Sequence, residues 1–192
     1  MKKQTPNLLA ALSLIILSPL LVCAEPPPTP ISETVWTKKI ACNLRMVELQ
    51  RVREKTTVAA KNGTERVVEK YVYKLALIDG AGTPEKIYDL SRARQIRMIA
   101  TAYYPGDPLA WGDGTVTYTG RKMQRGIVAV DPKIIPLGTR LYISGYGYGY
   151  AADTGNAIIG NRIDLGVNNV EEEKAWMHRP VTVYILEKAA TW

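Results

Sequence analysis

The sequence predicts an all-β fold, either a closed barrel or a sandwich, for the C-terminal half of this 192-residue chain. Beyond residue 95, six or seven short runs are rich in β-branched residues or tyrosine, and each is bounded by Gly, Pro or Asn. Only residues 170–177 have the pattern of a helix. Many short strands separated by turns are typical of barrels and sandwiches.

The chain opens with the pattern of a secretory signal peptide over residues 1–24. It has a basic start, a mostly apolar stretch at 8–22 and small residues up to a cleavage site after Ala24. The apolar stretch is too short and too interrupted for a transmembrane helix. Lipidation of Cys23 is the less favoured alternative, because Val22 is bulkier than the residue such sites prefer. We expect an exported protein of the cell wall, periplasm or extracellular space, with envelope association as an option.

Cleavage of the first 24 residues leaves 168 of the 192, with Cys42 as the one cysteine, and lowers the formal net charge from +7 to +5. A single thiol forms no intramolecular disulfide, so the hydrophobic core must stabilise the exported part. A basic exported chain suits an anionic wall polymer or lipid surface, and ordinary solubility explains the charge equally well. Nucleic acid is not an expected partner, because the chain has no Arg/Lys run and no aromatic-basic motif.

Between the signal peptide and the β-rich half, residues 25–32 are proline-rich and predict an extended linker. Residues 33–94 are charged and predict a small spacer or wall-binding module, mainly β or mixed. Within it, residues 66–73 alternate as in a strand and residues 79–82 are typical of a turn. Residues 44–52 fit either a strand or a short helix.

The second expected domain, residues 95–192, contains three aspartates in or beside its strands. The expected strands cover residues 96–102, 126–130, 138–143, 148–152, 162–165 and 181–186. Strand alternation places Asp164 on the face opposite Ile163 and Leu165. If the apolar pair faces the core, Asp164 faces a cleft or solvent.

Asp153 lies 11 residues before Asp164, a separation that fits a strand end, a Gly/Asn loop and a return strand. Both carboxylates then line one cleft, where their proximity raises one pKa and supplies a general acid. Carboxylates held in a small β-fold, with no histidine, cysteine or metal cluster nearby, point to acid/base chemistry on a sugar bond.

Each aspartate also has a purely structural interpretation. Asp164 fits a solvated strand residue, which the pattern alone favours, and Asp153 fits equally well an Asx turn that bonds the backbone of its own loop. Asp131, which precedes Pro132, fits a cap of the following turn, and for this residue the structural interpretation is preferred.

Other catalytic classes find little support. Asp153-Thr154-Gly155 matches the aspartic-protease signature, but Ile158-Ile159-Gly160 follows too soon for the β-structure that separates these motifs in such proteases. With His178 as the one histidine and a single mature cysteine, Ser/His/Asp catalysis and zinc hydrolysis lack their usual residue sets.

Aromatic and basic side chains near the aspartates have two interpretations each. Tyr146, Tyr148 and Tyr150 alternate with glycine and fit a sugar-stacking platform or plain packing. Lys122 and Arg125 fit contacts to an anionic substrate or a solvated loop, and the second is preferred.

Several motifs together resemble the three-aspartate (3D) domain family, over residues 97–187. That family is named for aspartates that match Asp131, Asp153 and Asp164. It is related to the barrel of membrane-bound lytic murein transglycosylase A and to stationary-phase-survival and resuscitation-factor-like wall proteins. The matching segments are Thr101-Ala102-Tyr103, the run 126–139, Gly145-Tyr146-Gly147, Ala152-Asp153-Thr154-Gly155, the run 160–165 and the closing strand 181–186.

The resemblance implies a six-stranded double-psi β-barrel that cleaves peptidoglycan glycan strands without a metal or cofactor. It implies that Asp164 protonates the glycosidic oxygen between N-acetylmuramic acid and N-acetylglucosamine, then accepts the C6 hydroxyl proton as a 1,6-anhydro ring closes. Asp153 is implied as its supporting carboxylate. The implied substrate-binding residues are Thr101, Tyr103, Gly155 and Asp131.

Two departures from the family pattern bear on this function. Asn156 replaces a glycine and Ile159 replaces a lysine in the loop after Asp153, which alters glycan specificity or weakens turnover. Two other functions stay open. One is a double-psi barrel that binds wall glycan or a partner enzyme without cutting, and the other is a glycoside hydrolase that uses water.

Overall fold

The computed structural model describes residues 30–40, 45–60, 63–107 and 114–187. The expected signal peptide and Cys42 lie outside these residues. The elements of the described part are, in chain order, β1 (Ile31–Ile40), β2 (Met46–Ala59), β3 (Glu65–Ile78), β4 (Pro84–Asp89), β5 (Gln95–Tyr103), β6 (Ile127–Val130), β7 (Arg140–Ile143), β8 (Gly147–Asp153), β9 (Arg162–Gly166), α1 (Val170–Ala175) and β10 (Arg179–Glu187).

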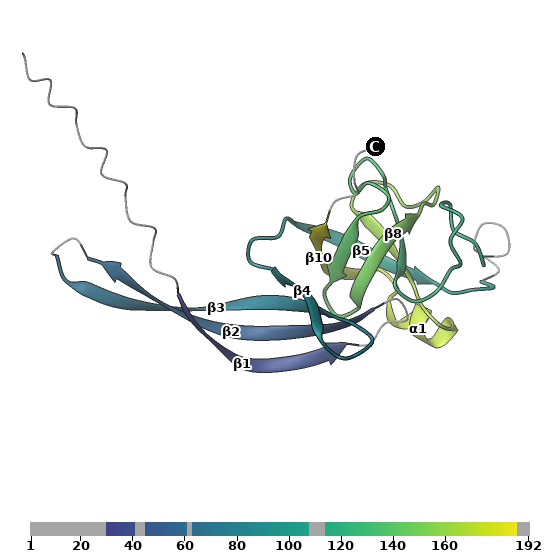
Figure 1. Ribbon diagram of the computed structural model, residues 1–192. Coiled ribbons are helices and arrows are strands. Elements are labelled where there is room, and N and C mark those ends of the chain that lie inside the picture. The colour runs from purple at the N-terminus through teal and green to yellow at the C-terminus, as the bar shows by residue number, and fades with distance from the viewer. Residues whose placement is uncertain (1–29, 41–44, 61–62, 108–113, 188–192) are drawn as a thin grey trace, which may run out of the picture.

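The N-terminal elements form an antiparallel sheet in the order β1-β2-β3-β4, drawn as a long arm in Figure 1. β1 begins at Ile31, so the last two residues of the proline-rich stretch belong to a strand. The helix alternative for residues 44–52 is wrong from Met46 onward, because those residues are in β2. Their alternation puts Val47 and Leu49 on one face, where they pair with Leu77 and Leu75 of β3.

The C-terminal strands close into a six-stranded barrel in the order β10-β5-β9-β6-β8-β7. The pairs β5–β9 and β6–β8 are parallel, and the other four neighbouring pairs are antiparallel. This confirms the expected all-β class and the six-stranded double-psi barrel with a β appendage. The expected helix is α1, which ends at Ala175 rather than at residue 177. No helix of the described segments has the length and apolar character needed to cross a membrane.

The barrel interior is filled by alternate residues of all six strands, among them Ala100, Val128, Leu141, Ile163 and Val183, each fully or almost fully buried. Burial of such apolar side chains provides the main stabilisation of the barrel.

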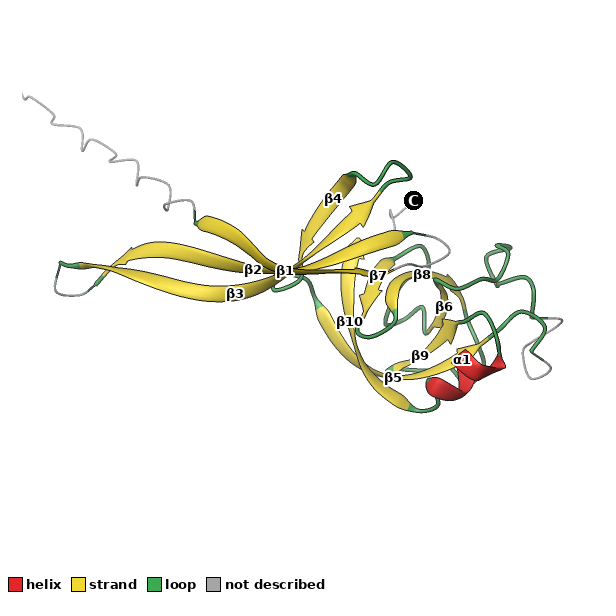
Figure 2. Ribbon diagram, turned by 90° about the horizontal axis from the view of Figure 1, so that it is seen from below, coloured by secondary structure: helices red, strands yellow, loops and turns green. Residues whose placement is uncertain are grey.

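A second apolar cluster joins the sheet to the outside of the barrel. Val47, Leu75 and Leu77 of the sheet pack with Tyr142 of β7 and Tyr148 of β8. In the closed ring, β7 lies opposite β9, so the sheet covers the side of the barrel that faces away from β9. Figure 2 shows the same arrangement, with β9 and α1 remote from the sheet.

Candidate acid site

Asp164 lies in the middle of β9, between two residues of the barrel core. Ile163 and Leu165 are fully buried inside the barrel, so Asp164 projects from its outer face, where it is partly buried. The alternation predicted from the sequence is therefore confirmed.

The strand register places Asp153 and Asp164 in one row. Ala129 of β6 pairs with Asp164 on one side and with Asp153 on the other. Direct partners on neighbouring strands project to the same face of a sheet, so both carboxylates belong to the outer face of the barrel. Their Cα atoms are two strand spacings apart, or about 10 Å.

A β-bulge in β8 brings Asp153 onto this face. Val128 pairs with Ala151, but the next residue of β6, Ala129, pairs with Asp153, so Ala152 is the extra residue. Without the bulge, Ala152 would occupy the outer position and Asp153 would point inward.

Two residues of β5 donate hydrogen bonds to the two aspartates. Thr101 pairs with Asp164, and its hydroxyl donates to Asp164 Oδ1 at 2.6 Å. The Tyr103 hydroxyl donates to Asp153 Oδ2 at 2.9 Å. Thr101, Tyr103, Asp153 and Asp164 are called the acid site below. The structure thus brings together four of the six residues singled out in the sequence.

Asp153 also accepts two backbone hydrogen bonds. The amides of Tyr118 and Thr154 donate to Oδ1 at 2.8 and 2.9 Å. The bond from Thr154 is the local turn contact that the structural interpretation anticipated. Tyr103 and Tyr118 are distant in sequence, so Asp153 is held by three separate segments of the chain.

Burial raises the pKa of Asp164 to about 6. The Thr101 hydrogen bond opposes this increase, because it stabilises the carboxylate, whereas the negative charges of Asp107, Glu173 and Asp153 add to it. A carboxyl group with a pKa near 6 has substantial protonated and ionised populations close to neutral pH. Such a group is suited to donate a proton and then to accept one.

Sequence reasoning missed Asp107, Glu173 and Tyr118. Asp107 is buried in the loop after β5, and Glu173 is on α1, which packs near β5. Tyr118 acts through its backbone amide, which no side-chain pattern reveals. The one available signal was Asp107 itself, an acidic residue in the loop that follows the Thr101–Tyr103 motif.

Asp131 connects two loops and makes no recorded contact with the acid site. Its carboxylate accepts hydrogen bonds from the amides of Lys133 at 2.9 Å and Gly160 at 2.8 Å. These bonds lower the pKa of Asp131. The contacts favour the structural interpretation of this residue.

Gly155 lies in the loop after β8, where an added Cβ would meet the side chain of Ile158 at 3.0 Å.

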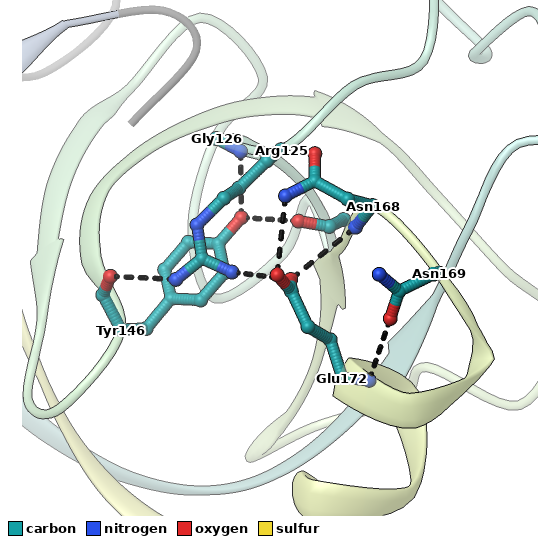
Figure 3. Close-up of polar contacts among 7 residues, drawn as sticks. Arg125, Gly126, Tyr146, Asn168, Asn169 and Glu172 are labelled. Atoms are coloured by element: carbon teal, nitrogen blue, oxygen red, sulfur yellow. Dashed lines mark hydrogen bonds and ion pairs between the residues drawn. The ribbon is translucent and has the colours of Figure 1, made fainter. Parts of the chain in front are cut away.

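A polar network anchors the end of β9 to α1, as Figure 3 shows. The Arg125 guanidinium lies over the Tyr146 ring, 4.8 Å from its centroid, and donates to Glu172 Oε2 at 2.6 Å. The Tyr146 hydroxyl accepts from the Gly126 amide and donates to the Gly166 carbonyl, both at 2.6 Å. The interpretation of Arg125 as part of a solvated loop is therefore wrong, and its contact with an anionic substrate stays a prediction.

The tyrosine platform is also wrong, and the packing alternative is confirmed for two of its three members. Tyr146 and Tyr148 are 1% and 5% exposed, in different apolar clusters on the two sides of the barrel wall. Tyr150 is partly buried under the guanidinium of Arg121, whose Cζ is 4.7 Å from the ring centroid.

A closed barrel with paired aspartates on its outer face defines the class of this protein, a double-psi barrel with an acid site. Residues 126–187 match the 3D domain family. The match covers about a third of the chain and includes strands β6 to β10 of the barrel.

Two curated relatives from Bacillus subtilis (strain 168) match parts of the chain. The cell wall-binding protein YocH is 39% identical over 98 residues, which are 49% of this chain and 33% of that protein. The putative cell wall shaping protein YabE is 45% identical over 60 residues, or 31% of this chain and 15% of that protein. The chain thus spans a third or less of the length of these relatives.

Crystal structures of MltA from E. coli overlap the chain partially. One covers 38% of this chain and 28% of MltA at 27% identity, with a TM-score of 0.32. Another, with bound chitohexaose, gives the same coverage and TM-score at 24% identity. These overlaps are too partial to assign a function.

Proposed function

We propose that this chain is an exported peptidoglycan lytic transglycosylase that acts in cell-wall turnover. The observation that carries the proposal is the environment of Asp164. This carboxyl group lies on the outer face of the barrel, accepts a hydrogen bond from Thr101 and has a pKa of about 6. It therefore suits a reaction in which one group is acid and then base.

In the proposed reaction, protonated Asp164 donates its proton to the glycosidic oxygen between N-acetylmuramic acid and N-acetylglucosamine. The C–O bond to C1 of the muramic acid breaks, and positive charge develops at C1. The Asp164 carboxylate then accepts the proton of the C6 hydroxyl as that oxygen bonds to C1. The products are a 1,6-anhydro-muramoyl end and a chain that ends in N-acetylglucosamine, and Asp164 regains its proton.

The other residues of the acid site support this step. Asp153, held in place by Tyr103 and two amides, places a carboxylate near the developing positive charge. Thr101 directs one oxygen of Asp164 and leaves the other for the sugar. We assign Gly155 and Asp131 to the loops that border the substrate, with Asp131 acting through loop geometry.

The names of the relatives support a cell-wall substrate. One is called cell wall-binding and the other putative cell wall shaping, and both match part of this chain at 39% and 45% identity. The first name also favours a second candidate function, a barrel that binds wall glycan without cutting it. A hydrolase that uses water in place of the C6 hydroxyl is the third.

Digestion of purified peptidoglycan separates the three functions. The purified chain is incubated with peptidoglycan, and the released fragments are identified by mass spectrometry. Anhydro-muramoyl ends are the expected result. Reducing ends would establish the hydrolase instead. Co-sedimentation with the wall without release would establish the binding function and remove Asp164 from catalysis.

A further inference from the structure

The sheet and the barrel meet at a pocket of about 510 Å³, called the junction pocket below. Trp36, Arg51 and Tyr73 line it from the sheet, and Tyr142 and Tyr184 line it from the barrel. Volumes of this size are typical of sites for small ligands. In the ring order, β7 and β10 lie opposite β9 and β6, so the junction pocket and the acid site are on opposite sides of the barrel.

Aromatic rings form both walls of the junction pocket. Trp36 and Tyr73 remain 45% and 47% exposed, although both belong to strands that continue into the packed interface. Facing them, Tyr142 and Tyr184 pack with ring centroids 5.7 Å apart. Large aromatic surfaces that stay exposed inside a concave site usually mark a binding surface.

Arg51 supplies the one cationic group of the junction pocket. Its Cζ atom lies 4.2 Å from the centroid of the Tyr71 ring. Among the described residues it has no recorded carboxylate partner, whereas its neighbour Arg53 pairs with Glu33. A guanidinium that is oriented by an aromatic ring and retains its N–H donors is suited to bind a carbonyl or carboxylate oxygen.

The chemistry of this pocket distinguishes among ligand classes. β2, β3, β7 and β10 each have a neighbour on both sides, so among the described strands that line the pocket only β1 offers a free backbone edge for a peptide to extend. A single cation does not provide the electrostatic attraction that nucleic acids need. Flat aromatic faces beside one hydrogen-bond donor group fit a pyranose, whose apolar face stacks on rings and whose substituents accept hydrogen bonds.

We propose that the junction pocket is a second saccharide-binding site, in which a pyranose stacks on Trp36 and Tyr73 and an acetamido or carboxylate oxygen accepts hydrogen bonds from Arg51. The identification of the saccharide as wall glycan rests on the proposed function. Because this site lies across the barrel from the acid site, the protein holds one stretch of glycan while it acts on another.

The test uses the full chain with Asp164→Asn, which leaves saccharides intact. Chitohexaose, a neutral N-acetylglucosamine hexamer, and a soluble muramyl peptide with free carboxylates are titrated separately. Tryptophan emission and calorimetry are recorded. Binding is expected to change the emission of Trp36, and adding Trp36→Phe should abolish that change. Adding Tyr73→Ala should weaken binding at the junction pocket at least about tenfold, as loss of a stacking residue does.

Val67→Ala provides the matched control, because Val67 is exposed on the same face of β3 as Tyr73 but six residues away. It should leave the affinity unchanged. Arg51→Met compares the two ligands: a greater loss for the muramyl peptide identifies a carboxylate as the bound oxygen, and an equal loss identifies the acetamido group. The same emission change and the same affinity with Trp36→Phe and Tyr73→Ala would overturn the proposal.

The two proposals fail separately. If the wild-type chain releases anhydro-muropeptides but saccharide does not change the emission of Trp36, the lytic function is supported and the proposed saccharide site in the junction pocket is refuted. If saccharide changes the emission of Trp36 but no muropeptide is released, the saccharide site in the junction pocket is supported and the lytic function is refuted.

Discussion

Asp164 accepts a hydrogen bond of 2.6 Å from the hydroxyl of Thr101, and the two residues are also direct partners in the β5–β9 ladder. Burial and this bond act on the pKa of Asp164 in opposite directions, and burial has the larger effect. The protonation of Asp164 therefore depends on groups that single substitutions can remove, which makes the acid site accessible to experiment.

We expect Asp164→Asn to reduce the release of anhydro-muropeptides by about 10²–10⁴-fold, the usual contribution of a general acid/base group. Asparagine keeps the shape and the acceptor for Thr101 but cannot transfer the proton. Chromatography and mass spectrometry of digested peptidoglycan measure the loss. Asp79→Asn, in an exposed turn of the sheet, is the charge-matched control and should keep the parent rate. Parent-level release by Asp164→Asn would eliminate this residue as the catalytic acid.

The pH profile of cleavage should report the pKa of Asp164. Since the first step needs the protonated form and the pKa is about 6, kcat/KM should fall tenfold per pH unit above that value. Thr101→Val removes a bond that lowers this pKa, so the alkaline limb should move to higher pH by about one unit. Initial rates between pH 4 and 9 measure the shift. An unmoved limb in the valine variant would mean that another group controls the profile.

The same pKa predicts that Asp164→Asn stabilises the protein at neutral and alkaline pH. The folded-state pKa is raised from 3.8 to about 6, so the folded chain binds this proton more tightly than the unfolded chain. The stability that the protonated Asp164 side chain contributes is fully present below pH 3.8 and is lost as the pH rises through 6. At pH 8 the asparagine variant should gain about 1–3 kcal/mol in the free energy of unfolding.

Urea denaturation at pH 8 and at pH 3.5 tests this prediction. The difference between Asp164→Asn and the parent should vanish at the lower pH, where both side chains are neutral. An equal difference at both pH values would point to packing rather than to the buried charge.

The strands of the barrel and the orientation of Asp164 were predictable, because both follow from local alternation. Ile163 and Leu165 enter the core, and Asp164 must then face outward. The position of Asp153 was not predictable in this way, since it depends on the bulge at Ala152. A bulge changes the face of every later residue, and its position is set by pairing with a distant strand.

Long-range partners explain the other gaps in the prediction. Tyr118 and Asp107 reach the site from a connection between β5 and β6 that has little periodic pattern. Residues 44–52 fitted two structures because charged and apolar residues are mixed along them. These residues form a strand from Met46 onward because β2 pairs with β3 over its whole length. Local propensity is weak compared with such tertiary contacts.

Tyr103→Phe should test whether the orientation of Asp153 matters for cleavage. It removes one of the three donors to that carboxylate and leaves the ring in place. We expect a stability loss of about 1 kcal/mol and a decrease of roughly tenfold in the rate. Tyr118→Phe is the control, because the Tyr118 ring is 74% exposed and only its backbone amide holds Asp153. Equal rates for both variants would exclude a role for the Tyr103 hydroxyl.

Asp131→Asn should lower the melting temperature, and its effect on cleavage should arise only through the geometry of the two loops that Asp131 connects. Its two carboxylate oxygens accept from two amides, those of Lys133 and Gly160, and the amide nitrogen of asparagine cannot replace one of these acceptors. We expect a decrease of about 3–6 °C at neutral pH. Lys133→Ala retains the backbone amide and should have a smaller effect.

The stability that Asp131 contributes depends on pH in the opposite direction to the stability that Asp164 contributes. The hydrogen bonds lower the pKa of Asp131, so its carboxylate contributes stability above the ordinary value of 3.8 and loses it as the pH falls through the lower folded-state pKa. The melting temperatures of the parent and of Asp131→Asn should therefore converge below about pH 4. Calorimetric scans from pH 3 to 7 measure the convergence. If instead the variant keeps the parent stability but loses cleavage, Asp131 contacts the substrate directly.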